Sequence, residues 1–138
     1  MLCQSPAAGQ LQFRRAMFNL FACNQGDHSK NWAFLQNDDG TWQLSPAYDI
    51  TFSPTPFNEH ATAFAGYSKP PPLKAIQTLA SAASFAKWSL AQQVIEEIVE
   101  SLSTFAQTAK ILGVKPSTIK LIEKQLDQTW QSNKGLCK

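Results

Sequence analysis

The sequence predicts an α+β fold in which helices dominate and a small β-hairpin supplies the main strands. Apolar residues recur at helical spacing early in the chain and through most of its second half. Between these stretches, two short apolar segments flank an Asp-Gly pair, which is a strong hairpin signal. The order of helix, hairpin, long loop and further helices is typical of an α+β domain.

The first helix is predicted over residues 10–23, after a loose lead-in over residues 1–9. Its apolar face would consist of Phe13, Met17, Leu20 and Phe21. Asn and Gly in the segment 24–26 accept the left-handed conformation that ends helices. The adjacent Arg14 and Arg15 are expected on the exposed face of this helix.

The hairpin is predicted from residues 32–36 and 41–44, which flank the turn 37–40. Trp32 and Trp42 are expected to pack against each other across the two strands. Three prolines make residues 45–60 a loop, in which Phe52 and Phe57 would pin a bent segment to the surface. Residues 61–66 read as one more short strand.

The second half is predicted to be helical. Three consecutive prolines precede a helix near residues 73–86. A stripe over residues 89–103 consists of Leu90, Val94, Ile95, Ile98, Val99 and Leu102. A short helix near 104–112 stops at Gly113, and Pro116 begins a last helix. The buried face of that last helix would carry Ile119, Ile122, Leu126 and Trp130.

Composition narrows the class of protein. With 138 residues, 43% hydrophobic and 16% charged, the chain reads as one globular domain over residues 1–138. A net charge of +2 without a run of Lys or Arg argues against direct nucleic acid binding. No apolar stretch long enough for a membrane span occurs, and no secretory signal is visible. Three cysteines, Cys3, Cys23 and Cys137, lack CxxC spacing, so reduced thiols in a cytoplasmic protein are expected.

Polar residues concentrate in two loops, over residues 24–31 and 45–49, at the two ends of the predicted hairpin. A hairpin returns the chain close to where it left, so Asn31 and Asp49 should lie near each other. One amide oxygen and one carboxylate suit Mg²⁺ when phosphates supply the other ligands. Kinases hold Mg-ATP in this way, with an Asn and an Asp.

These loops also carry a specific resemblance. The segment from Phe13 to Asn31 is similar to HipA-type serine/threonine kinases, in which a helix runs into N-x-D-[DGA]-H-x-K-N. Residues 45–49 resemble the P-x-Y-D segment of that family, and the 18 positions from Asn31 to Asp49 fit it. The resemblance extends from about residue 11 over nearly the whole chain. It implies the C-terminal lobe of a kinase-like fold, with the hairpin carrying the metal-binding loops.

The resemblance implies roles for single residues. Mg²⁺ and ATP would be the cofactors, with Asn31 and Asp49 as metal ligands. His28 would lie with them at the nucleotide, and Lys30 would contact the transferred phosphoryl group. Alternatives remain open from the residues alone. Asn31 would cap a turn, Asp49 would bond loop amides, Lys30 would be solvated, and His28 would pack and hydrogen-bond to hold its loop.

Two departures from the family pattern bear on activity. The catalytic base of the family is an Asp five residues before the metal-binding Asn, and that position is Gly26. Asp27 lies at a spacing of four, so it is a doubtful substitute base. The second departure is that no glycine-rich phosphate loop and no V-A-I-K-like strand occurs in these 138 residues. The half of a nucleotide site that an N-lobe supplies is therefore expected to be absent from this chain.

The function expected first is that of a HipA-like kinase C-lobe with residual Mg-nucleotide contacts, inactive as a lone chain. One alternative is a non-catalytic module, a pseudokinase lobe that binds an antitoxin protein or a separate N-lobe chain. Another is a split kinase completed by that second chain, with Asp27 as base. The resemblance implies a toxin–antitoxin setting. An uncovered apolar face beside Asn31 and Asp49 would favour a homodimer or another protein partner.

Overall fold

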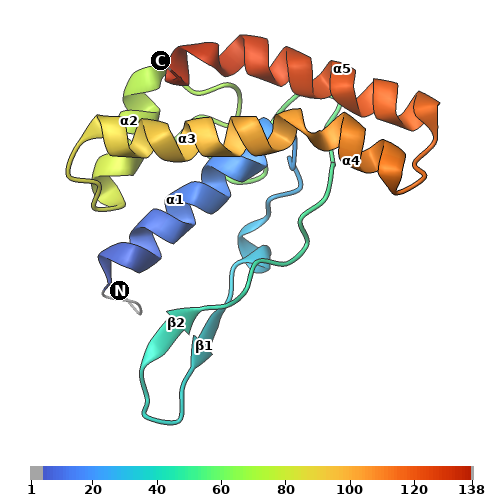
Figure 1. Ribbon diagram of the computed structural model, residues 1–138. Coiled ribbons are helices and arrows are strands. Elements are labelled where there is room, and N and C mark those ends of the chain that lie inside the picture. Colours follow the sequence, from blue (N-terminus) through green and yellow to red (C-terminus); the bar gives the residue numbers. More distant parts are fainter. Residues whose placement is uncertain (1–4, 138) are drawn as a thin grey trace.

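The computed structural model describes residues 5–137 and confirms a predominantly helical α+β fold. Within those residues the α-helices are α1 (Pro6–Phe21), α2 (Leu73–Ala82), α3 (Trp88–Ser103), α4 (Phe105–Ile111) and α5 (Pro116–Asn133). The two antiparallel strands are β1 (Phe34–Gln36) and β2 (Trp42–Leu44), and 3₁₀ turns cover Ser29–Asn31 and Lys134–Leu136. The hairpin projects away from the helices, whereas α5 runs back alongside α3 (Figure 1).

The hydrophobic core forms where α1 packs against α3, α2 and α5. The side chains enclosed most fully in this core include Met17 of α1, Ile76 of α2 and Ile95 of α3. The predicted apolar faces of α1 and α3 supply most of this core, although Leu90 of the α3 stripe is 44% exposed. On α5, Ile119 is buried while Ile122, Leu126 and Trp130 are half-buried. No helix of the described chain is both long and apolar enough to cross a membrane.

Helix α1 starts earlier than predicted. Residues from Pro6 onward are helical rather than a loose lead-in, because Pro is well suited to the first turn of a helix. Gly9 sits against the end of α2, where an added Cβ would approach the carbonyl oxygen of Ala83 to 3.0 Å. Its lack of a side chain therefore lets the first turn of α1 pack closely. The rest of the predicted lead-in, residues 1–4 with Cys3, lies outside the described residues.

Three helices end in the same backbone arrangement, with a residue of positive φ just past the end. These residues are Cys23 (φ 56°), Ser84 (φ 65°) and Gly113 (φ 75°). In each case the next N–H donates back to a carbonyl five residues earlier, as in the bond from Phe85 to Ala80. After α2 this turn comes four residues before the predicted end and brings Phe85 onto Phe13, with ring centroids 5.1 Å apart.

Two strand predictions are wrong. Trp42 pairs in register with Gln36, and Trp32 lies before β1, so the two tryptophans are not cross-strand partners. The hairpin is almost entirely exposed, which removes the core that would have held them together. Residues 61–66 form no strand; a single bridge joins Phe64 to Tyr67 around a tight turn at Ala65 and Gly66, both with positive φ.

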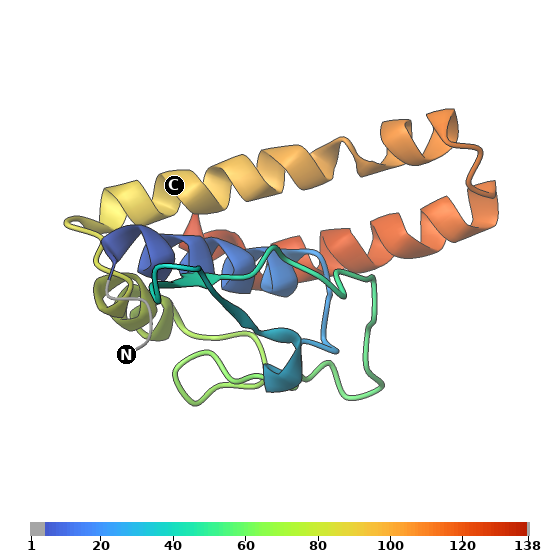
Figure 2. The ribbon, with the colours of Figure 1, turned by 90° about the horizontal axis from the view of Figure 1, so that it is seen from below.

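The long segment over residues 45–72 forms a layer of loops. Figure 2 shows this green segment on the side of α1 that faces away from α3. It is joined to the chain after α1 by a parallel bridge between Asn24 and Ser53. The loops that carry the polar residues are thus fastened to the end of α1.

Candidate functional site

The loop after α1 is held by a network centred on Asn24. Its carbonyl oxygen Oδ1 accepts from the Ser53 hydroxyl at 3.0 Å, and its Nδ2 donates to Asn19 at 3.0 Å. Backbone bonds from Ser53 to Cys23 and from Gln25 to Ser53 complete the bridge. Asn24 is 3% exposed. This network fixes the direction in which residues 26–31 leave the helix.

Asn31 and Asp49 meet at the base of the hairpin, as the return of the chain predicts. The Asn31 Nδ2 donates to the Asp49 carboxylate at 2.5 Å and lies 3.4 Å from the Gly26 carbonyl oxygen. Asp49 adopts a positive φ of 53°, which is unusual for a residue other than glycine but accessible to Asp and Asn. The left-handed backbone aims its side chain at the first loop.

Further bonds hold the two loops together. The Tyr48 hydroxyl donates to the Lys30 carbonyl oxygen at 3.0 Å, and the Arg15 guanidinium donates to the Ser45 carbonyl oxygen at 2.6 Å. Arg15 is therefore half-buried and structural, not on the exposed face of α1 as expected. Arg14 does lie toward solvent, in an ion pair with Glu97 at 2.5 Å. The two arginines are adjacent in the sequence, and nothing in the sequence indicated that one would be half-buried and the other exposed.

Asp27 points into the protein. Its side chain is 2% exposed, and its carboxylate accepts from the Thr62 backbone N–H at 3.1 Å while lying 3.0 Å from His60 Nδ1. The Thr62 hydroxyl also donates to the Asp27 carbonyl oxygen. His60 is itself buried, with its ring edge-on to Phe64. Both carboxylate oxygens of Asp27 are thus engaged with the segment 60–62.

The remaining candidate residues lie on the outer side of the loop. His28 is exposed, so the expectation that it packs to hold the loop is wrong; the buried His60 performs that task instead. Lys30 is exposed next to Asn31. Gly26 is half-buried with its N–H donating to the Ser53 hydroxyl at 3.1 Å, and an added Cβ would lie 3.2 Å from that hydroxyl oxygen.

Around Asn31 and Asp49 there is a small pocket of about 20 Å³, also lined by Arg15, Asn24 and Tyr48. That volume accommodates about one water-sized group. Among residues 5–137, no cluster of three or more His, Cys, Asp or Glu side chains is arranged to hold a metal ion.

Sequence reasoning missed the residues that support the site. Asn24, Gln25, Ser53 and His60 are buried or half-buried in the loop layer, and they hold the candidate loop by hydrogen bonds. Their partners lie about thirty positions away along a proline-rich stretch without periodicity. The one sequence feature that could have indicated these supporting residues is the concentration of Asn, Gln, Ser and Thr in segments that also carry large apolar residues.

Comparison with known protein families places the chain. The sequence model described as "HipA-like C-terminal domain" matches residues 2–110. The chain belongs to this family, as the resemblance in its two loops predicted. A comparison with curated proteins found no match.

Proposed function

We propose that this member of the HipA-like C-terminal domain family supplies one side of a Mg²⁺–nucleotide site, with Asn31 and Asp49 as the two protein ligands. The observation that carries the proposal is the contact of their side chains at 2.5 Å. Two oxygen-bearing side chains held at one point match what Mg²⁺ takes from a kinase when phosphates supply its other ligands. Lys30 and His28 are exposed beside this point and would face the phosphates.

Metal binding at this point needs a small local change. Asn31 presents Nδ2 to Asp49, and a nitrogen donor of this kind cannot ligate a cation. The ion would replace the hydrogen bond, and the amide would turn so that Oδ1 faces the metal. Tyr48 and Arg15 hold the backbone of both loops, so only the side chains need to move.

We further propose that the domain does not transfer the phosphoryl group by itself. Gly26 stands where the family carries its catalytic base, and a glycine offers no group to accept the proton of a substrate hydroxyl. Asp27 is a poor replacement, because its carboxylate faces His60 and Thr62 in the interior. In this proposal Asp27 positions the loop, and the nucleotide is bound without turnover.

A second candidate function, a partner-binding module, is favoured by the exposed apolar surface around the same loops. Five large side chains there, each 40–45% exposed, are Phe34, Leu35, Trp42, Tyr48 and Ile50. Exposed large apolar side chains of this kind are typical of protein interfaces. The partner would be an antitoxin protein, a separate N-lobe chain or a second copy of this chain. Light scattering tests the last case: a Leu35→Lys variant should dissociate a dimer, and an unaltered mass would exclude the hairpin as its interface.

The nucleotide proposal is tested by calorimetric titration of ATP with and without Mg²⁺. Asp49→Asn removes the charge while keeping shape and tolerating positive φ. Asp38→Asn makes the same charge change in the exposed hairpin turn and serves as the matched control. We expect Mg-dependent binding that Asp49→Asn weakens about tenfold or more, the effect of roughly 1.4 kcal/mol, and that Asp38→Asn leaves unchanged. Equal affinities in the two variants would exclude Asp49 as a ligand.

A further inference from the structure

The turn between α4 and α5 exposes a run of aliphatic side chains. Ile111 and Leu112 are 77% and 75% exposed, and Val114 is 36% exposed. Lys110 and Lys115 bracket these residues and are exposed as well. We call these five residues the tip. In Figures 1 and 2 the tip forms one end of the molecule, beyond the other helices and the hairpin.

The fold holds the tip out from the body of the domain. Behind it, where α4 and α5 pack together, Ala109 and Ile119 are 3% and 5% exposed. Gly113 takes a positive φ of 75°, which turns the chain from α4 toward α5. The N–H groups of residues 112–114 all donate to carbonyl oxygens of α4. These three N–H groups need no water, so this part of the turn can enter a less polar medium at low cost.

Positive charge is concentrated around the tip. Residues 101–122 carry three lysines and no aspartate or glutamate, whereas the formal net charge of the whole chain is only +2. The three are Lys110, Lys115 and Lys120, and among residues 5–137 no ion pair includes any of them. A surface that complements the tip is therefore both negatively charged and able to accept aliphatic side chains.

An anionic lipid surface meets both requirements. A nucleic acid backbone would match the charge but would leave Ile111 and Leu112 against a polar surface. Protein interfaces are enriched in aromatic residues and depleted in lysine, whereas the tip has two lysines and no aromatic residue. At a membrane, aliphatic groups enter the boundary between headgroups and acyl chains, and lysine ammonium groups remain at the anionic headgroups.

We propose that the tip binds the surface of anionic membranes, with Ile111 and Leu112 inserted at the headgroup boundary. The contact is peripheral and needs no helix that crosses the bilayer. Two inserted side chains and three lysines give reversible attachment, which weakens as salt screens the lysines. The tip lies apart from the base of the hairpin (Figure 1), so the contact involves neither Asn31 nor Asp49 and requires no nucleotide.

Sedimentation of the whole chain with lipid vesicles, in buffer without nucleotide, tests the proposal. We expect binding to vesicles of equal parts phosphatidylserine and phosphatidylcholine, and binding at least about tenfold weaker to pure phosphatidylcholine. The double variant Ile111→Ser/Leu112→Ser keeps the charge and should weaken binding about tenfold or more. Leu90→Ser should not, because Leu90 is 44% exposed at the other end of α3.

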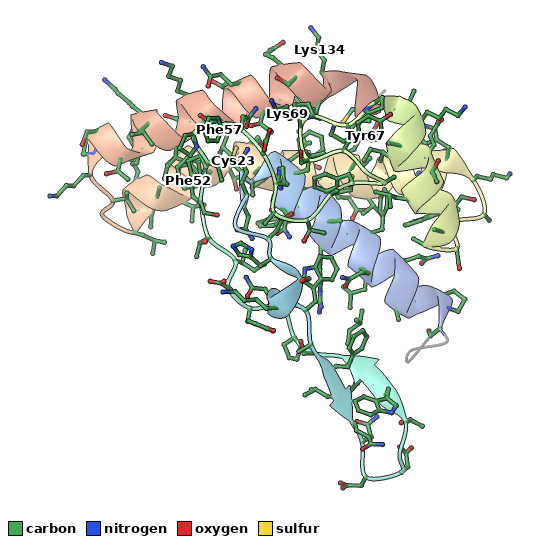
Figure 3. The ribbon with its side chains drawn as sticks, turned by 180° about the vertical axis from the view of Figure 1, so that it is seen from behind. Cys23, Phe52, Phe57, Tyr67, Lys69 and Lys134 are labelled. Carbon is green, nitrogen blue, oxygen red and sulfur yellow. The ribbon has the colours of Figure 1, made fainter. Side chains whose placement is uncertain are left out.

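A second pair of variants tests the charge. Lys115→Gln should weaken binding about fivefold, the effect of roughly one lysine beside an anionic surface. Lys134→Gln removes the same charge just past the end of α5 that is farther from the tip (Figure 3), and should change the affinity by less than about twofold. Circular dichroism checks that each variant keeps its helical content, as substitutions of exposed side chains should allow.

Three results would overturn the proposal. The first is the absence of binding to the anionic vesicles. The second is equal binding by the unaltered chain and the double serine variant, which would indicate charge attraction without insertion, or an equal loss with Leu90→Ser. The third is self-association in light scattering that the double serine variant abolishes, without vesicle binding, which would assign the tip to a protein contact instead.

Discussion

Replacing Asp27 with alanine is expected to unfold the candidate loop and to destabilise the whole domain. The change removes the acceptor of the Thr62 backbone N–H and the partner of His60 Nδ1. Both side chains of the Asp27–His60 pair are almost completely buried, at 2% and 4% exposure. Water cannot reach the groups left behind without opening the loop layer.

The expected loss of unfolding free energy follows from these contacts. Leaving a buried polar group without its partner costs about 1–3 kcal/mol, and this change leaves two such groups, the Thr62 N–H and the His60 ring. Domains of this size have about 5–15 kcal/mol of unfolding free energy. The variant should therefore remain mostly folded but lose a large part of its stability. Asp38→Ala, an exposed carboxylate in the hairpin turn, should change the unfolding free energy by no more than about 0.5 kcal/mol.

Urea unfolding followed by circular dichroism measures both variants, and an unchanged slope would show that only stability has changed. The double variant with His60→Ala should lose much less than the sum of the two single changes, because both remove the same contact. A loss below about 1 kcal/mol for Asp27→Ala, or additive effects, would refute a positioning role. The carboxylate would then be available for other chemistry, including that of a base.

Three further outcomes are expected. Gly26→Asp should cost about 1–3 kcal/mol, because the added side chain displaces the Ser53 hydroxyl, which bonds Asn24 and the Gly26 N–H. The unaltered chain should transfer no radiolabelled phosphate from ATP to protein, and transfer by it that Asp49→Asn abolishes would refute our proposal. Burial raises the pKa of the Cys23 thiol. The stability that the buried neutral thiol contributes should therefore be complete below the pKa of the thiol in the unfolded chain and lost as pH rises through its pKa in the folded chain. Urea should speed the reaction of this thiol with a disulfide reagent. Gly113→Ala should cost about 1 kcal/mol, because φ is +75°, whereas Gly135→Ala, also in open space but without positive φ, should cost less in thermal unfolding.

The elements that sequence alone predicts well are those that depend on local pattern. Helical stripes placed α3, α4 and α5 within a residue or so, because their apolar faces, proline starts and Gly113 are all local signals. The contact of Asn31 with Asp49 followed from hairpin geometry. Their roles as metal ligands, and those of His28 and Lys30, stay predictions.

The errors occur where contacts between residues far apart in the sequence determine the local structure. Trp32 and Trp42 were expected to pair because tryptophans on neighbouring strands usually share a core, but this hairpin has no core beneath it. Residues 61–66 have strand-like composition, yet Phe64 is drawn into the helical core and the Asp27 contact holds Thr62. Sequence reasoning gave His60 no structural role, because a histidine in a proline-rich loop at no regular spacing from His28 forms no pattern. The burial of His60 depends on its contact with Asp27, which only the folded structure shows.

The loop after α1 separates the candidate site from a second polar pocket, and consecutive residues of the loop line the two. Asn24 lines the pocket at Asp49, whereas Gln25 lines the second pocket, which lies against α5. Gln25 also accepts from the Thr55 N–H at 2.6 Å and donates to Asn58 at 2.5 Å, and Asn24 accepts from Ser53. One hydrogen-bonded network therefore borders both pockets, so the residues that line the second pocket also help to hold the loop that carries Asn31.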